Sequence, residues 1–193
     1  MMMMLSRSAA ANSRLSLASL SFSSSSLRNS KELLRNDALW QPGSFIDGEF
    51  VYDSSKTGTF DVLNPATGSV LTEMPRHGAT ETSLAIDAAH RSWSDWKKKT
   101  VKERSKVLSR LFDLIDENKD DLATIMTLES GKPLAEAKGE ILYANSFVEL
   151  YAEECKRIKG EVIPAPLSNR RLLSIKEPVG PCALITPWNF PAA

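Results

Sequence analysis

An amide side chain on a stiff loop is the first group in this sequence whose setting suggests chemistry. Residues 187–191 read Pro-Trp-Asn-Phe-Pro, so Asn189 lies between two aromatic residues with a proline at each end. The loop follows a short apolar run, residues 182–185, whose flanking turn residues are typical of a strand buried in a parallel sheet. Proline cannot donate a ladder hydrogen bond, so we expect this strand to end before Pro187. Because α/β folds bind ligands at the carboxyl ends of parallel strands, Asn189 is a candidate site residue. The alternative is a proline-rich turn with a structural tryptophan.

The string Ile-Thr-Pro-Trp-Asn-Phe-Pro at residues 185–191 resembles the motif that opens the coenzyme-binding domain of the aldehyde dehydrogenase superfamily. The resemblance implies that Ile185, Thr186, Pro187 and Trp188 lie along a nicotinamide coenzyme, mainly through their backbone. It also implies that the Asn189 side chain helps to form the oxyanion hole for the thiohemiacetal made from a small aldehyde substrate. The coenzyme is NAD or NADP, since the contacts that discriminate them belong to segments beyond residue 193.

Further motifs extend the resemblance along most of the chain. An Asn-Pro-Ala-Thr-Gly turn at residues 64–68 and Glu-Ser-Gly-Lys-Pro at 129–133 both resemble motifs of the same superfamily. The strings at 131–141 and 151–157 resemble its succinate-semialdehyde dehydrogenase branch, which implies oxidation of succinate semialdehyde to succinate in 4-aminobutyrate degradation. Another aldehyde dehydrogenase, of the betaine or methylmalonate-semialdehyde type, remains an alternative. So does a non-catalytic subunit that acts through oligomerisation.

Aldehyde oxidation also needs a thiolate nucleophile and a general base. The resemblance puts the family's catalytic cysteine and glutamate beyond residue 191. Cys155 falls on a predicted apolar helix stripe and Cys182 in the predicted buried strand, so we expect both to be packed, unreactive thiols. We therefore expect the chain to be a truncated product, whether a splice variant, a gene-model fragment or a cut, and to be inactive alone.

The elements predicted around these motifs are those of an α/β fold that is rich in helices and has β-hairpins. An Asp-Gly pair centres a hairpin over residues 45–51, and a strand at 60–63 turns back at 70–71. A helix from about Thr80 and a second that starts at a Thr100–Glu103 capping box follow. A short third helix ends at Gly131, and a fourth runs from about 133 to 158. Their charged residues are interpreted as a solvated face. The resemblance implies an incomplete, amino-terminal portion of the Rossmann-like coenzyme-binding domain.

The same elements suggest a domain map. We expect residues 42–193 to form the aldehyde dehydrogenase part, with 178–191 as the first buried strand and its loop. By the same resemblance, residues 160–177 correspond to a hairpin that pairs subunits in the family, which implies a homo-oligomer. Arg170 and Arg171 on this hairpin are interpreted as edge guards or rim contacts rather than as substrate ligands.

Composition excludes several other classes of protein. The 193 residues carry 24 basic and 24 acidic side chains, so nothing suggests nucleic acid as a partner. No stretch is long and apolar enough to span a membrane, and the two cysteines show no metal-ligand spacing. Residues 1–30 contain three arginines, many serines and no acid. That pattern predicts a transit peptide over residues 1–35 and a mitochondrial matrix location, with plastid import as the alternative.

Overall fold

The computed structural model describes residues 30–53 and 57–193, and the predicted transit peptide lies almost wholly outside them. A short 3₁₀ turn, η1 (Asp37–Leu39), comes first. The strands are β1 (Ser44–Ile46), β2 (Glu49–Val51), β3 (Thr59–Leu63), β4 (Val70–Pro75), β5 (Glu161–Ile163) and β6 (Leu172–Ser174). The helices are α2 (Ala79–Trp96), α3 (Val101–Glu117), α4 (Lys119–Ser130), α5 (Leu134–Glu154) and the 3₁₀ turn η2 (Cys155–Arg157). The strands form separate antiparallel pairs, β1–β2, β3–β4 and β5–β6.

The hairpin and capping predictions are confirmed where the sequence signal is local. Asp47 and Gly48 both have positive φ, 53° and 89°, as the two-residue turn between β1 and β2 requires. At the start of α3 the Glu103 amide donates to Thr100 Oγ1 at 3.3 Å. The Thr100 amide donates in return to Glu103 Oε2 at 2.7 Å, so two amides without intrahelical partners are satisfied.

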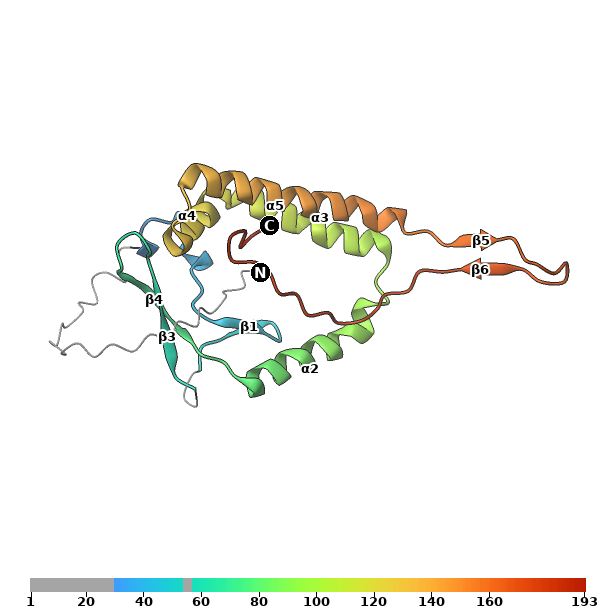
Figure 1. Cartoon of the computed structure of the whole chain (residues 1–193), viewed down its shortest axis with the longest axis horizontal. Helices are drawn as coiled ribbons and strands as arrows, with labels where there is room; N and C mark the ends of the chain where they lie inside the picture. The colour runs from blue at the N-terminus through green and yellow to red at the C-terminus, as the bar shows by residue number, and fades with distance from the viewer. Residues whose placement is uncertain (1–29, 54–56) are drawn as a thin grey trace.

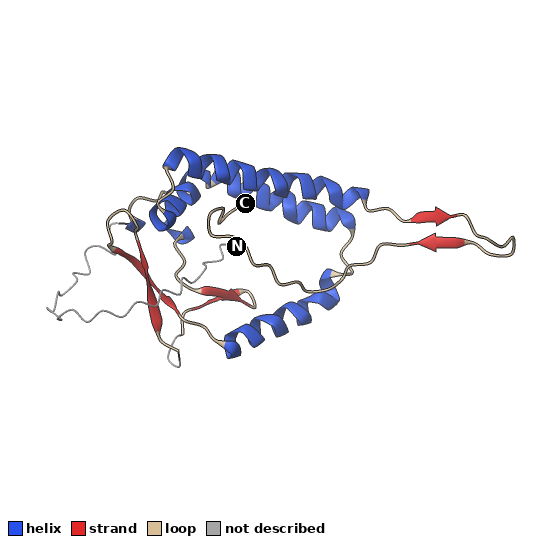
Figure 2. Ribbon diagram, in the orientation of Figure 1, coloured by secondary structure: helices blue, strands red, loops and turns tan. Residues whose placement is uncertain are grey.

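Two helices lie side by side as the main layer, and a third joins them at one end (Figure 1). α3 and α5 pack along their lengths, and α4 packs across the first turns of α5. Below this layer in the view, α2 stands apart, and the chain from residue 175 onwards runs as coil between the two (Figure 2). The β5–β6 hairpin projects away from everything else (Figure 1).

Most of the buried apolar side chains that the structure describes belong to two small clusters around α4. One joins Leu34, Trp40 and Leu71 to Ile125 of α4, and the other joins Met126 of α4 to α5. The packed part thus begins ahead of residue 42, where the sequence suggested the start of the domain. The Asp121 carboxylate fixes this early segment, since it accepts the Arg35 and Asn36 amides at 3.1 and 2.8 Å.

The predicted strand at residues 182–185 is absent, which corrects the domain map. These residues are extended coil, and Ile185 is 91% exposed. A strand is stable only when its backbone groups pair with neighbours, and no parallel partner exists in the part of the chain that the structure describes. The exposed Cys182 is therefore not the buried thiol that the sequence predicted.

The helix stripes are also less buried than their spacing predicted. On α3, Leu108 and Ile115 are half-buried, but Val107, Leu111 and Leu114 are exposed. The fourth helix ends at Glu154, before the predicted residue 158, and its Phe147 and Tyr151 face solvent. Spacing identifies the apolar face of a helix, but burial requires a partner on that face. α3 and α5 cover part of each other's apolar face, as the buried Ile141 shows, and no described segment covers the rest. Cys155 is half-buried beside this face.

Candidate functional site

The predicted site residues lie on one continuous segment at the end of the chain. Ile185 and Trp188 are exposed, Thr186 is half-buried, and residues 188–191 turn back toward the helices. The Asn189 side chain is exposed and makes no hydrogen bond to a described residue. A free amide of this kind is available to donate to a ligand.

Two charged side chains hold this loop against the helix layer. Lys132, between α4 and α5, donates from Nζ to the backbone oxygen of Asn189 at 2.8 Å. Glu140, on α5, accepts the amide of Ala192 at Oε1, 2.9 Å away. Lys132 and Glu140 form an ion pair with each other through Oε2. The Lys132 ammonium also lies 4.8 Å from the centroid of the Phe190 ring, within the range of a cation–π interaction.

The joint between α4 and α5 determines where these two side chains lie. Gly131 ends α4 in the left-handed conformation, with φ at 73°, and its amide donates to Thr127 O at 2.9 Å. Lys132 follows directly, and Pro133 is the N-cap of α5. Glu140 then faces inward from α5, so that its side chain is only 2% exposed, against 16% for Lys132.

The interpretation of these charges as a solvated helix face is wrong for Lys132 and Glu140. A usable signal was present in the spacing: Glu140 follows Ala137 by three residues and precedes Ala144 by four, so it falls on the predicted apolar face of α5. A carboxylate on such a face is buried only when it is paired and hydrogen-bonded. That requirement points to a partner such as Lys132.

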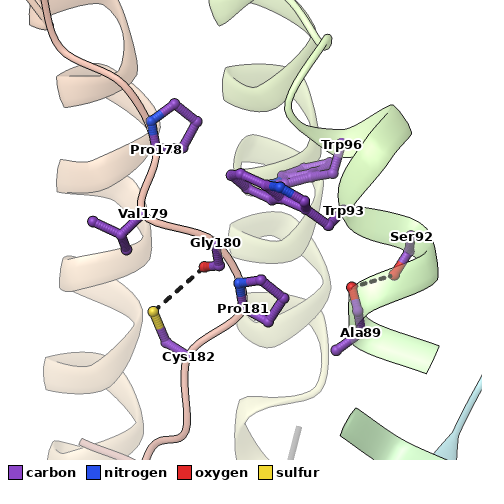
Figure 3. Close-up of a pocket in the computed structure, with 9 residues that line it drawn as sticks. All are labelled: Ala89, Ser92, Trp93, Trp96, Pro178, Val179, Gly180, Pro181 and Cys182. Carbon is purple, nitrogen blue, oxygen red and sulfur yellow. Dashed lines mark hydrogen bonds between the residues drawn. The ribbon is translucent and has the colours of Figure 1, made fainter. Parts of the chain in front are cut away.

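An apolar groove of about 480 Å³ separates α2 from the coil that leads to the loop (Figure 3). Trp93 and Trp96 form one wall, and residues 178–182 form the other. The Cys182 thiol contacts the Gly180 carbonyl oxygen at 3.5 Å. None of the lining residues is a base or a cation, and a catalytic thiol needs one of these to become a thiolate. Cys182 therefore lacks the surroundings of a nucleophile.

A second unusual carboxyl lies close in sequence, at Glu129 near the end of α4. Burial raises the pKa of Glu129 to about 7. Its neighbours around a small cavity are mostly apolar, among them Trp40, Pro42 and Ile125. An acid in such surroundings keeps its proton to near neutral pH because the charged form is poorly solvated.

Residues 185–188, the predicted coenzyme contact, present a backbone that is open to a ligand. Its amides and carbonyls make no hydrogen bond to other described residues, so they are free to approach a ligand. No described His, Cys, Asp or Glu side chains are grouped as metal ligands, and no described helix could cross a bilayer.

Residues 51–193 match the model of the aldehyde dehydrogenase family. The chain belongs to this family. Curated relatives include a glutarate-semialdehyde dehydrogenase of Pseudomonas putida, which is 51% identical over 160 residues. That alignment covers 83% of this chain and 33% of the relative. A mitochondrial succinate-semialdehyde dehydrogenase of Arabidopsis thaliana is 46% identical over 162 residues, which are 84% of this chain and 30% of the relative.

Solved structures of this family have the same fold. The crystal structure of succinate-semialdehyde dehydrogenase from Burkholderia pseudomallei superposes with a TM-score of 0.79 at 51% identity. It covers 82% of this chain, and the match takes up 33% of that one. The chain thus spans about a third of the length of the curated relatives it matches. The predicted membership of the aldehyde dehydrogenase family and the partial α/β fold are confirmed.

Proposed function

We propose that this chain is the amino-terminal part of a semialdehyde dehydrogenase that oxidises succinate semialdehyde to succinate with NAD or NADP. The observation that carries the proposal is the exposed Asn189 amide on a loop held by Lys132 and Glu140, in a chain of this family. The sequence strings at 131–141 and 151–157 support the succinate branch, as does the 46% identity to the plant relative.

Each residue of the loop has a separate task in this proposal. The Asn189 side chain donates a hydrogen bond to the oxyanion that forms when a thiolate attacks the aldehyde carbon. The backbone of residues 185–188 borders the coenzyme and helps to orient it. NAD or NADP, when bound, provides the acceptor for the hydride that leaves the same carbon. The thiolate and the general base come from the family's segments that follow this one, so the chain alone catalyses no turnover.

A second substrate has comparable support. The Pseudomonas putida glutarate-semialdehyde dehydrogenase is 51% identical to this chain, so the semialdehyde that is one methylene longer is the second candidate. Both molecules join an aldehyde to a carboxylate. One methylene changes binding by about 1–3 kcal/mol, so kcat/KM for the two substrates should differ by roughly 10–200-fold.

We also propose a partner and a location for the protein. Val162 and Leu173 face each other across the β5–β6 hairpin and are 79% and 71% exposed, as expected of a hairpin that pairs subunits of a homo-oligomer. The predicted transit peptide of residues 1–35 directs the protein to the mitochondrial matrix in this proposal, and it should end before Leu34, whose side chain packs in the core. A fusion of residues 1–40 to a fluorescent protein should enter mitochondria. A plastid signal would change the address, and a diffuse cytosolic signal would refute import.

The enzymatic proposal is tested with a chimera. In it, residues 30–193 replace the matching segment of the Burkholderia pseudomallei enzyme, to which the structure is 51% identical. The chimera should reduce NAD or NADP in the presence of succinate semialdehyde. Asn189→Ala should lower kcat about 10²–10³-fold with a much smaller change in coenzyme affinity. An unchanged kcat, with chemistry rate-limiting, would refute the oxyanion role. Turnover by the 193-residue chain alone would refute the proposal that the thiolate and the general base come from other segments of the family.

A further inference from the structure

The Lys132–Glu140 pair is the most buried charged group near the loop, and nothing in the proposed reaction uses it. Taking two charges out of water is costly unless further hydrogen bonds satisfy them. Here the loop supplies those bonds. Lys132 Nζ donates to Asn189 O at 2.8 Å, and Glu140 Oε1 accepts Ala192 N–H at 2.9 Å. The ion pair and the loop therefore stabilise each other.

The two contacts lie at Asn189 itself and three residues after it. One fixes the carbonyl of Asn189 itself, and the other fixes the amide of Ala192, so the intervening Phe190 and Pro191 are held at both ends. The Phe190 ring lies under the Lys132 ammonium at 4.8 Å. All three contacts leave the Asn189 side chain free. The main chain is thus anchored at Asn189 and at Ala192 while the side-chain amide of Asn189 remains available.

From this geometry we infer that Lys132 and Glu140 are positioning residues that set the place of the Asn189 amide. The inference rests on the proposed oxyanion role of Asn189. An oxyanion donor is effective only when it is fixed beforehand where the charge develops. A displacement of about 1 Å can lower the rate about 10²-fold. The pair acts through Asn189 and does not itself touch the reacting atoms.

Kinetics of the chimera provide the main test. Lys132→Met keeps most of the length of the side chain and removes its donor, and it should lower kcat by about tenfold to a hundredfold. Glu140→Gln, which breaks the ion pair, should act in the same direction. KM for the aldehyde should change much less than kcat, since the lost interaction serves the transition state. Lys138→Met is the matched control, because Lys138 is on α5 like Glu140 and pairs with Asp120 at 2.7 Å, away from the loop.

A double-mutant cycle separates positioning from a merely structural role. If Lys132 acts through Asn189, Lys132→Met should lower kcat by less than about twofold once Asn189→Ala is present. An effect of full size in that background would overturn the inference, as would an unchanged kcat in the single variant. If Asn189→Ala alone leaves kcat unchanged, the proposed oxyanion role of Asn189 is refuted. That result differs from the two outcomes that would overturn only the positioning role of Lys132.

Hydrogen exchange on the 193-residue chain tests, without any catalysis, whether Lys132 and Glu140 hold the loop. The Ala192 amide should exchange about tenfold faster in Lys132→Met and in Glu140→Gln than in the unaltered chain. The Glu103 amide, bonded to Thr100 Oγ1 on α3, is the internal control and should not change. Unchanged exchange at Ala192 would show that the pair does not hold the loop and would overturn the inference even if the chimera failed to fold.

Discussion

Gly131→Ala perturbs the joint from which Lys132 reaches the loop. Gly131 has φ at 73°, a conformation that costs an alanine about 1–2 kcal/mol. A Cβ at this position would also lie 2.9 Å from Cγ of Pro65, so the proline or the joint must move. A small overpacking of this kind adds about 1 kcal/mol. We expect the substitution to lower the free energy of unfolding by roughly 2–3 kcal/mol.

Gly139→Ala is the matched control because the same change should have the opposite sign there. Gly139 lies inside α5, and a Cβ at that position would meet no atom within 4 Å. Replacing glycine by alanine inside a helix stabilises it by about 0.5–1 kcal/mol. The two variants have the same composition, so any difference between them comes from the position.

Urea unfolding of the two variants, followed by circular dichroism, provides the measurement. The Gly131→Ala midpoint should fall and the Gly139→Ala midpoint should rise, each with an unchanged m-value. The reasoning is refuted if Gly131→Ala loses less than about 0.5 kcal/mol, a change typical of surface substitutions. It is also refuted if both variants are destabilised equally, because the φ angle would then have no influence.

Three further predictions concern other parts of the chain. Asp121→Ala removes the acceptor of two backbone amides and should cost about 2–3 kcal/mol, measured by the same unfolding assay. Glu129 binds its proton more tightly in the folded state, because its pKa is raised to about 7. Its ionisation therefore lowers the free energy of unfolding increasingly from about pH 4.5 to pH 7, and by the full amount above pH 7. Glu129→Gln should therefore gain up to roughly 3 kcal/mol at pH 8 and nothing at pH 4, and an equal gain at both would refute this cause. Val162→Lys with Leu173→Lys should reduce self-association in sedimentation experiments without loss of helix content, and unaltered association would exclude the hairpin as the interface.

Features that depend on a few neighbouring residues could be predicted from the sequence. The Asp47-Gly48 turn, the Thr100–Glu103 capping box and the end of α4 at Gly131 are all confirmed. In each case the residue type itself satisfies the local backbone, either through positive φ or through a side-chain acceptor. No distant part of the chain is needed for these features, so they can be predicted from the neighbouring residues of one sequence.

Features that depend on distant partners could not be predicted in this way. The apolar run at 182–185 has the composition of a buried strand, yet it is exposed coil because no described strand pairs with it. Glu140 is of a residue type that usually lies on the surface, yet it is buried because Lys132 and the Ala192 amide bind its carboxylate oxygens. In both cases the partner, rather than the residue type, determines burial.

These two outcomes together bear on how the candidate site is built. The loop that carries Asn189 is in place although the strand that leads into it has not formed. Its position therefore comes from the α4–α5 joint, through Lys132 and Glu140, and not from the sheet edge that the sequence suggested. In the proposed reaction the donor Asn189 is therefore held by this joint while residues 182–185 are coil. It follows that substitutions that disturb the α4–α5 joint itself, such as Gly131→Ala, should lower kcat through the position of Asn189 in the proposed reaction, whereas Lys138→Met on α5 should not.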